Sequence, residues 1–245
     1  MCYTAFYLKK RKNEEIEKIL RRELKEKQAM NADGFACLKI NENFEIKEYK
    51  RELKLLLATK MVENFEKYNL FHFRLATAGK KNKLNIHLWR RNDFIFAHNG
   101  TVYTYSRNKE FSDSFLFFIN LSEKLKKLKE RNEKEIVKIL ENEIEESNLF
   151  GRGFLLDLST KKLYCFGDLK IYCSKDFLLI SSAEVEFKRK RKLFGVDFEE
   201  KVKVFEKEID GYYVFDLRKE TLRKVKERTS YPSYYSYYQN RRFGF

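Results

Sequence analysis

Short apolar runs and amphipathic segments alternate through the first half of the chain. Residues 2–8 and 33–40 are rich in aromatic and apolar residues and predict strands, the second entered through a turn at Asp33-Gly34. Residues 13–29 place apolar side chains at helical spacing in a charged background, which predicts an amphipathic helix. Residues 46–68 repeat that pattern and predict a second helix. The apolar positions behind the two helix predictions are Ile16, Ile19, Leu20 and Leu24, then Leu53, Leu56, Leu57, Met61 and Phe65.

The second half combines one amphipathic stretch with many short apolar runs. Residues 115–147 predict one long helix or two helices joined near Arg131-Asn132, and Ser112 or Asp113 stands where a side chain would cap the start. From residue 153 onward, apolar runs separated by turn residues predict strands. These runs are 153–158, 163–166, 171–173, 177–181, 202–205 and 212–217. The periodicity therefore indicates an α+β fold.

The composition supports one folded domain. With 245 residues, 43% hydrophobic content, 23 Phe and 15 Tyr, the chain has enough apolar side chains for a substantial core. No uninterrupted apolar run reaches the roughly 18 residues that a membrane helix needs. Basic residues at 9–12 interrupt the start before a signal-peptide apolar region is complete. We therefore expect a cytoplasmic protein that does not bind a membrane.

Cysteine and histidine are sparse and widely spaced. The four cysteines form no C-x-x-C pair, and there are three histidines, so the sequence argues against a structural zinc site. Cys37, Cys165 and Cys173 stand in apolar, strand-like surroundings, which is typical of buried reduced thiols. We expect neither a metal nor another cofactor.

The net charge of +15 is the main signal for a different function, because a basic protein is attracted to polyanions whatever its fold. Lys and Arg are nevertheless mixed with Glu along the helical segments, as on solvated helix faces. The basic run at 187–192 is interpreted as a solvated loop. A non-enzymatic module that binds nucleic acid remains an alternative, although no nucleic-acid-binding motif supports it.

The stretch 71–102 gathers polar groups between apolar runs. Arg74 follows the apolar run at 71–73, and a guanidinium can bind a carboxylate through two hydrogen bonds. Asn99 and Gly100 follow the apolar run at 94–96, and an Asn amide beside a Gly backbone N–H makes a pair of donors for an oxyanion. Asn-Gly is also the commonest type I′ hairpin turn, so a plain turn is the alternative.

A nucleophile for such donors stands at the other end of the sequence. Cys2 directly follows the initiator methionine. If Met1 is removed, the α-amino group of Cys2, with an ordinary pKa of about 7.7–8.0, lies beside the thiol as a general base suited to neutral pH. Whether Met1 is removed is left open by the sequence.

These groups follow one another in the order seen in a known family. In sequence they are Cys2, Asn31-Ala32-Asp33-Gly34-Phe35-Ala36, Arg74-x-x-Thr77-x-Gly79, Asn85-x-His87, His98-Asn99-Gly100 and Ser112-Asp113. In this order the chain resembles the class II glutamine amidotransferases, a branch of the N-terminal nucleophile (Ntn) hydrolases. Two departures stand out. Ala36 replaces the second Gly of an Asp-Gly-x-Gly turn, and Leu88 replaces the usual Pro after His87, which affects the local turn more than the chemistry.

The resemblance implies a fold and a reaction. It implies a four-layer α/β/β/α sandwich of the Ntn-hydrolase type over residues 1–228, with the Tyr- and Ser-rich tail 229–245 outside the match. In the implied reaction, Cys2 attacks the side-chain amide of glutamine, Asn99 and Gly100 stabilise the oxyanion, ammonia leaves and water hydrolyses the thioester.

The resemblance also assigns roles in substrate binding. It gives the α-carboxylate of glutamine to Arg74 and the α-ammonium to Asp113, with Thr77 and Gly79 shaping the loop around the substrate. For His87 and His98 a structural and a functional role are both open from the residues, and we assign them support of the pocket backbone, with His87 counted among the substrate-binding residues. The ammonia would pass to a separate synthase subunit. An amidohydrolase of the same fold that acts on a γ-glutamyl peptide or another amide is the alternative enzyme.

Overall fold

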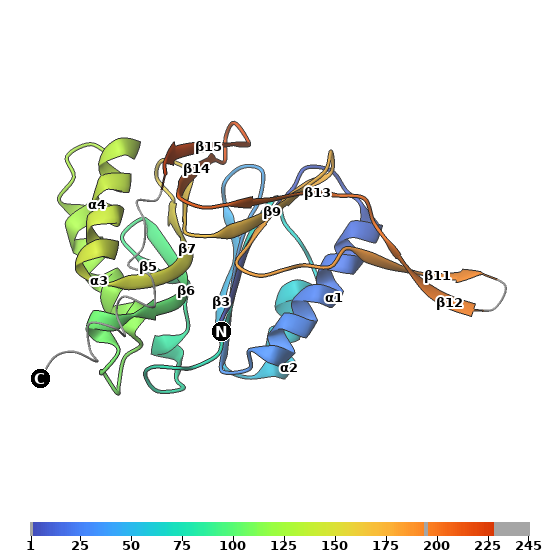
Figure 1. Cartoon of the computed structure of the whole chain (residues 1–245), viewed down its shortest axis with the longest axis horizontal. Coiled ribbons are helices and arrows are strands. Elements are labelled where there is room, and N and C mark those ends of the chain that lie inside the picture. Colours follow the sequence, from blue (N-terminus) through green and yellow to red (C-terminus); the bar gives the residue numbers. More distant parts are fainter. Residues whose placement is uncertain (1, 194–195, 228–245) are drawn as a thin grey trace, which may run out of the picture.

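The computed structural model describes residues 2–193 and 196–227. Within this part of the chain, two antiparallel sheets account for most of the strands (Figure 1). The order of the larger sheet is β13 (Phe205–Ile209), β9 (Leu169–Cys173), β10 (Phe177–Ser181), β1 (Tyr3–Lys9), β4 (Tyr68–Arg74), β2 (Gly34–Ile40) and β3 (Ile46–Glu52). The order of the smaller sheet is β15 (Thr221–Lys226), β14 (Tyr212–Asp216), β8 (Lys162–Phe166), β7 (Leu149–Asp157), β6 (Phe94–Val102) and β5 (Trp89–Arg91). The mixed α/β architecture predicted from periodicity is thus confirmed.

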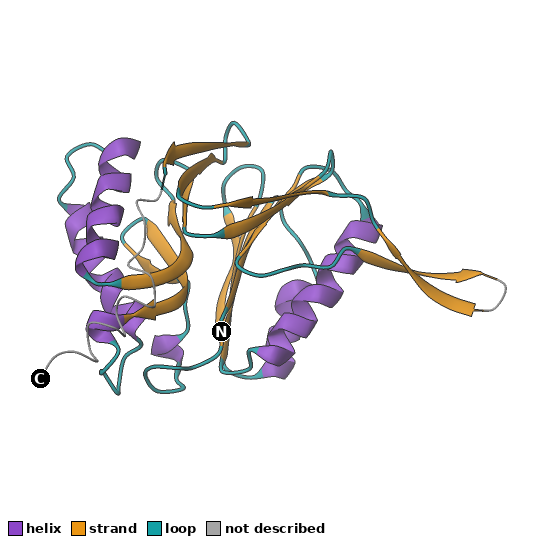
Figure 2. Cartoon of the chain, viewed as in Figure 1, coloured by secondary structure: helices purple, strands orange, loops and turns teal. Residues whose placement is uncertain are grey.

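Helices lie against both sheets (Figure 2). The α-helices are α1 (Glu14–Met30), α2 (Leu55–Ala58), α3 (Asp113–Lys126) and α4 (Glu133–Glu146). Three short 3₁₀ turns, η1 (Thr59–Val62), η2 (Lys83–Asn85) and η3 (Tyr103–Tyr105), connect other elements. As Figure 2 shows, α1 and α2 flank the larger sheet, while α3 and α4 flank the smaller one.

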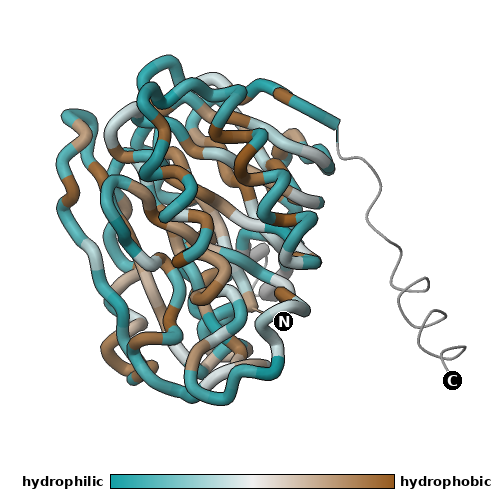
Figure 3. The backbone as a smooth tube through the Cα atoms, turned by 90° about the vertical axis from the view of Figure 1, so that its left-hand side faces the viewer, coloured by the Kyte–Doolittle hydropathy of each residue, from teal (hydrophilic) through white to brown (hydrophobic). Residues whose placement is uncertain are grey.

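Three apolar cores follow from this arrangement. One lies between the sheets and contains Phe6 and Leu8 of β1 with Ile95 and Ala97 of β6. A second lies between the larger sheet and α1, and a third between the smaller sheet and the pair α3 and α4. Apolar and polar positions are interspersed along the helices and strands, as expected where one face of each element is buried (Figure 3). Alternate residues of β1 and β6 therefore face different cores.

Side-chain caps fix the helix starts. Asn13, Ser112 and Asn132 are the N-cap residues of α1, α3 and α4, and each accepts a hydrogen bond from a backbone N–H in the first turn. The predicted stretch 115–147 is thus two helices, divided where Asn132 begins the second. Ser112 is the cap, whereas Asp113 is the first residue inside α3.

The predicted helix over 46–68 is wrong in its first part. Residues Ile46–Glu52 form the edge strand β3, paired with β2, and only Leu55–Ala58 and Thr59–Val62 are helical. Ile46, Tyr49 and Leu53 pack on the core between the sheets and mimic helical spacing. An edge strand is partly open to water, so charged residues occupy most positions of β3. The alternation of apolar and polar residues that predicts a strand is therefore absent.

The second half also departs from prediction in places. The basic run expected to be a loop is strand β11 (Lys188–Leu193), which pairs with β12 (Val196–Lys201) in a hairpin that projects from the body (Figure 1). The strand predicted at 202–205 instead begins at Phe205, and β15 was not predicted. The tail 229–245 lies outside the described residues, so the domain limit at 228 stays a prediction. None of the described helices is both long and apolar enough to cross a membrane.

Candidate active site

Cys2 lies immediately before β1, with its side chain partly exposed. Its Sγ atom is 3.4 Å from the backbone nitrogen of Leu75 and 3.4 Å from the carbonyl oxygen of the same residue. Leu75 directly follows β4, the neighbour of β1 in the larger sheet. The pairing of these two strands therefore brings the first residue of the described chain beside the polar stretch that follows Arg74.

The surroundings of Cys2 have opposing effects on the pKa of its thiol. Burial raises the pKa of Cys2, whereas the Leu75 backbone hydrogen bond and the positive charge of Arg74 lower it. The negative charge of Asp113 adds to the rise, and the net direction is upward. Because the thiolate is the nucleophilic form, the thiol needs a base to react at neutral pH.

Strand alternation turns Cys2 toward the smaller sheet. On β1, Tyr3, Ala5 and Tyr7 pack in the core beside α1, whereas Phe6 and Leu8 pack between the sheets. Side chains two residues apart share a face, so Cys2 projects toward the smaller sheet. On β6, Asn99 has the same parity as Ile95 and Ala97, which also pack between the sheets. Cys2 and Asn99 thus project toward the same space.

Asn99 and Gly100 lie inside β6 and not in a hairpin turn. They pair with Arg152 and Gly151 of β7, which excludes the type I′ alternative. A Cβ on Gly100 would lie 2.0 Å from the carbonyl oxygen of Phe150, so this close strand pairing requires glycine. The buried Asn99 side chain donates from Nδ2 to Ser182 Oγ at 3.0 Å.

The guanidinium of Arg74 holds the loop that follows it. Nη2 donates to the carbonyl oxygens of Ala78 at 2.6 Å and Gly79 at 3.5 Å, and Nη1 donates to that of Lys80 at 3.2 Å. Arg74 is almost completely buried. Its described contacts are therefore with backbone carbonyls, and they draw the loop carrying the exposed Thr77 back over the end of β4.

Gly79 and Asn85 attach this loop to the start of α3. Gly79 has φ 70°, and a Cβ there would lie 2.5 Å from the backbone nitrogen of Ser112. The buried Asn85 accepts from Ser112 N at 2.7 Å and donates from Nδ2 to the carbonyl oxygens of Lys80 and Glu110. One amide side chain thereby satisfies three backbone groups and fixes the loop against the helix start.

Asp113 joins α3 to β6. Its Oδ2 accepts from Val102 N and its Oδ1 from Ser114 N, both at 2.7 Å. The carboxylate is buried at the N-terminal end of the helix, where a negative charge is favoured by the helix dipole. Arg74 and Asp113 are close enough for their charges to act on the Cys2 thiol. Both charges therefore act on the thiol, with Arg74 lowering and Asp113 raising the pKa of Cys2.

His72, His87 and His98 are buried at β6: His98 belongs to the strand, and the His72 and His87 side chains contact its backbone. The rings of His72 and His87 are stacked with centroids 3.7 Å apart, and His87 Nδ1 accepts from the backbone nitrogen of His98. His98 Nδ1 lies 2.9 Å from Ser114 Oγ. Burial lowers the pKa of His72 to about 3 and that of His98 to about 4, and places the pKa of His87 well below 6.5. The His87 ring thus holds the backbone of His98 in the structure, and its support of a substrate pocket stays a prediction.

The turn after His87 accounts for one departure from the pattern of the family that the sequence resembles. Leu88, which stands where that family usually has Pro, is buried with φ 57°. A proline ring fixes φ near −65° and cannot adopt that conformation. The local turn therefore requires a residue other than proline.

Leu88→Pro is expected to destabilise the protein by about 3 kcal/mol or more, because it combines a forbidden φ with lost packing. The matched variant Leu88→Ala loses more side-chain volume but keeps a permitted backbone. Guanidinium unfolding of both should show the proline variant as the less stable. Equal or greater stability of the proline variant would contradict the assigned backbone conformation.

Two residues at the site, Asp33 and Ser182, have contacts that the sequence analysis did not predict. Asp33 Oδ2 accepts from Ala76 N at 2.8 Å, and Oδ1 lies 2.6 Å from Lys81 Nζ, so the Asp-Gly turn braces the loop after Arg74. The Asp33-Gly34 motif was a usable signal. Ser182 contacts Asn99 from a position after β10, where no motif marks it. Among residues 2–193 and 196–227, no three His, Cys, Asp or Glu side chains group as metal ligands.

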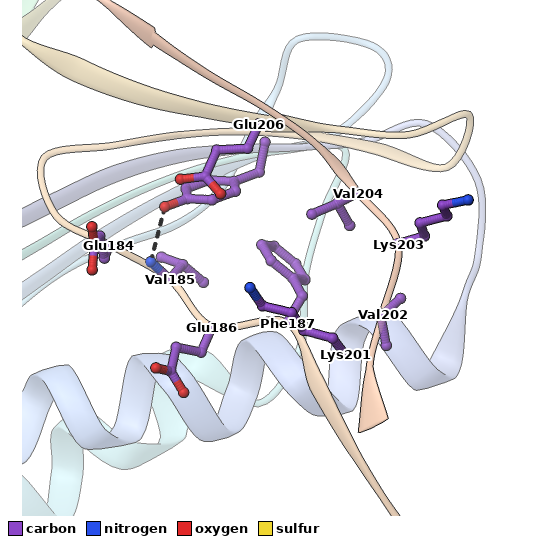
Figure 4. Close-up of a pocket in the computed structure, with 10 residues that line it drawn as sticks. Glu184, Val185, Glu186, Phe187, Lys201, Val202, Lys203, Val204 and Glu206 are labelled. Atoms are coloured by element: carbon purple, nitrogen blue, oxygen red, sulfur yellow. Dashed lines mark hydrogen bonds between the residues drawn. The ribbon is translucent and has the colours of Figure 1, made fainter. Parts of the chain in front are cut away.

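A separate pocket lies at the base of the β11–β12 hairpin (Figure 4). Its volume is about 390 Å³, and its lining includes Val185, Phe187, Val202 and Val204. Figure 4 shows the hydrogen bond from Val185 N to the hydroxyl of Tyr172, which is 3.1 Å long. None of the residues predicted for the site lines this pocket. The contacts described above make the region around Cys2 the candidate site.

Comparisons with known proteins give a fold. No protein-family model and no curated protein matches the sequence. The glutamine phosphoribosylpyrophosphate amidotransferase of B. subtilis, solved with ADP and GMP, matches with a TM-score of 0.53 and 12% identity over 94% of this chain and 50% of that chain. A structure described as the allosteric regulatory enzyme of purine biosynthesis matches with a TM-score of 0.59 and 13% identity over the same shares. This chain spans about half the length of both proteins and has the fold found in that half.

Proposed function

We propose that this chain is a glutaminase of the class II glutamine amidotransferase type, which hydrolyses the side-chain amide of glutamine through an N-terminal cysteine. The observation that supports this most is the setting of Cys2. Its partly exposed thiol lies 3.4 Å from the Leu75 backbone, within reach of the charges of Arg74 and Asp113, and projects toward the space that Asn99 faces. We also propose that the two sheets with their outer helices are the four-layer α/β/β/α sandwich of the Ntn hydrolases.

The reaction begins with proton transfer from the thiol. Removal of Met1 leaves the α-amine of Cys2 beside Sγ, and this amine takes the thiol proton. The sulfur attacks the amide carbon, a C–S bond forms, and the carbonyl π electrons move to oxygen. The Asn99 carboxamide and the Gly100 backbone N–H donate to that oxyanion. A base is needed here because burial keeps the pKa of Cys2 above its ordinary value.

Collapse of the tetrahedral intermediate releases ammonia. The carbonyl re-forms, the C–N bond breaks, and the protonated α-amine gives its proton to the departing nitrogen. Water, activated by the same amine, then attacks the thioester and releases glutamate and the free thiol. The proton therefore shuttles through one group in both halves of the reaction.

Arg74 and Asp113 bind the amino-acid end of the substrate in this proposal. A guanidinium has five N–H donors, and the described contacts of Arg74 to three carbonyls leave donors for the α-carboxylate. Asp113 Oδ1 accepts from Ser114 N and Ser114 Oγ, and Oδ2 accepts from Val102 N. A carboxylate offers about four lone-pair sites, so Oδ2 can also accept from the α-ammonium. Thr77 and Gly79 shape the loop over the substrate.

The ammonia is passed to a separate synthase in this proposal. The two matched structures extend over about twice the aligned length, and one of them is named as an amidotransferase. An assay of γ-glutamyl peptides beside free glutamine decides between this function and a γ-glutamyl amidohydrolase.

Intact mass before and after treatment with a glutamine-like diazo-ketone tests the proposal. We expect an initial mass lacking Met1, followed by one adduct that maps to Cys2 and is prevented by excess glutamine. Cys173, which is also partly exposed, serves as the internal control and should stay unlabelled. Retained Met1 with no adduct would overturn the proposed function.

A further inference from the structure

Ser182 connects the two sheets beside the candidate site. Its backbone nitrogen donates to Thr4 O at 2.9 Å, and its Oγ accepts from Thr4 N at 3.0 Å. The same Oγ is 3.0 Å from Asn99 Nδ2. Ser182, Thr4 and Asn99 are all buried. One hydroxyl thus contacts the strand that follows Cys2 and the side chain proposed for the oxyanion.

Two polar groups of this cluster lack a hydrogen-bond partner within the described residues. Two N–H groups point at Ser182 Oγ, and within the described residues the hydroxyl proton has no acceptor. Asn99 Oδ1 is buried and has no donor in the same part of the chain. A buried acceptor without a donor costs about 1–3 kcal/mol, so a native structure avoids it where a small change suffices.

Exchange of the oxygen and nitrogen of the Asn99 carboxamide gives a partner to both the Ser182 hydroxyl proton and Asn99 Oδ1, and leaves the Nδ2 N–H donors as the unpaired groups. The two ends of an Asn side chain have nearly the same shape, and the choice between them follows from the hydrogen bonds they make. After the exchange, Ser182 accepts from Thr4 N and donates its proton to Asn99 Oδ1. The Nδ2 group, with its two N–H donors, then occupies the buried position now held by Oδ1.

We infer that Ser182 is a positioning residue that turns the Asn99 carboxamide so that its N–H donors meet the oxyanion formed at Cys2. The inference rests on the proposed function. Cys2 and Asn99 project into the same space by strand alternation, and Thr4, two residues after Cys2, is the residue that fixes Ser182. With Nδ2 free, the site holds a donor awaiting an acceptor; with Oδ1 free, it would repel the developing negative charge.

Steady-state kinetics with matched variants test the inference. Ser182→Ala is expected to lower kcat for glutamine about tenfold with KM within about twofold, because orientation of an oxyanion donor acts on the transition state. Ser182→Thr keeps the hydroxyl and should restore most of kcat. The control is Ser181→Ala, which removes a neighbouring buried hydroxyl bonded to Ala183 O and not to Asn99. Equal kcat values for Ser182→Ala and Ser181→Ala would overturn the inference.

A double-mutant cycle separates positioning from a general structural effect. Asn99→Ala is expected to lower kcat about 10²–10³-fold. If Ser182 acts through Asn99, adding Ser182→Ala to Asn99→Ala should cause no further loss. A further tenfold loss in the double variant would overturn the positioning role.

The orientation itself is measured without turnover. In ¹⁵N-labelled protein, the Asn99 side-chain signal is assigned by its absence in Asn99→Ala. Nuclear Overhauser contacts from its NH₂ protons to the Cys2 β-protons support the inference, whereas dominant contacts to the Thr4 amide proton overturn it. If the wild type neither hydrolyses glutamine nor forms the Cys2 adduct, the proposed function fails, and this spectrum still decides how Ser182 orients Asn99.

Discussion

Replacing Cys2 with alanine is expected to abolish glutamine hydrolysis, with a fall in kcat of at least about 10⁴-fold. The variant has no atom that forms the thioester, so binding and the oxyanion donors alone remain. Ammonia release under saturating glutamine measures the loss. Stability should change by less than about 1 kcal/mol, because Sγ is partly exposed and makes only long contacts with Leu75.

Two further cysteine variants make that result specific. Cys173→Ala removes the other partly exposed thiol and should leave kcat unchanged. Cys2→Ser retains a weaker nucleophile and should keep the fold with little activity. Hydrolysis by Cys2→Ala within tenfold of the wild type would rule out the nucleophile assigned here. A loss of similar size in Cys173→Ala would point instead to oxidation or unfolding.

The parts of the fold with one strongly apolar face were predictable from sequence. The helix at 13–29 and the division near Asn132 were predictable because amphipathic spacing and an Asn cap act locally. Strand β10 was predicted with its observed limits, since its five residues are all buried. Strands at exposed edges were missed: β3 and β11 are dominated by charged residues, and their strand state depends on distant partners.

The candidate site divides in a similar way. The residues that precede or follow buried strands, such as Arg74 and Asn99, carry a signal in the order of motifs along the chain. The contacts that orient Arg74 and Asn99 have no such signal in the sequence. Ser182 meets Thr4 across 178 positions and Asn99 across 83, and a serine after a strand has no distinguishing pattern. The carbonyl contacts of Arg74 depend likewise on a loop path that Gly79 and Asn85 determine.

Acidification is expected to destabilise the protein through its three buried histidines. Burial lowers the pKa of His72 to about 3, that of His98 to about 4 and that of His87 well below 6.5, although the charge of Asp113 partly opposes the shift at His98. Below pH 6.5 the unfolded chain binds protons at these positions and the folded protein does not. Stability is therefore present above pH 6.5 and is lost as the pH falls toward the folded pKa values.

The expected loss is about 4 kcal/mol between pH 7.5 and 5.5, about 1.4 kcal/mol from each histidine. Urea unfolding at several pH values measures it, and this interval lies above the range in which carboxylates titrate. His72→Gln is the matched variant, since glutamine fills part of the same space and does not titrate. It should lose only about two thirds as much stability over the interval, whatever its stability at pH 7.5. A wild-type stability that is unchanged down to pH 5.5 would mean that the three histidines are hydrated or already charged. Their assignment as buried neutral rings that support β6 would then be wrong.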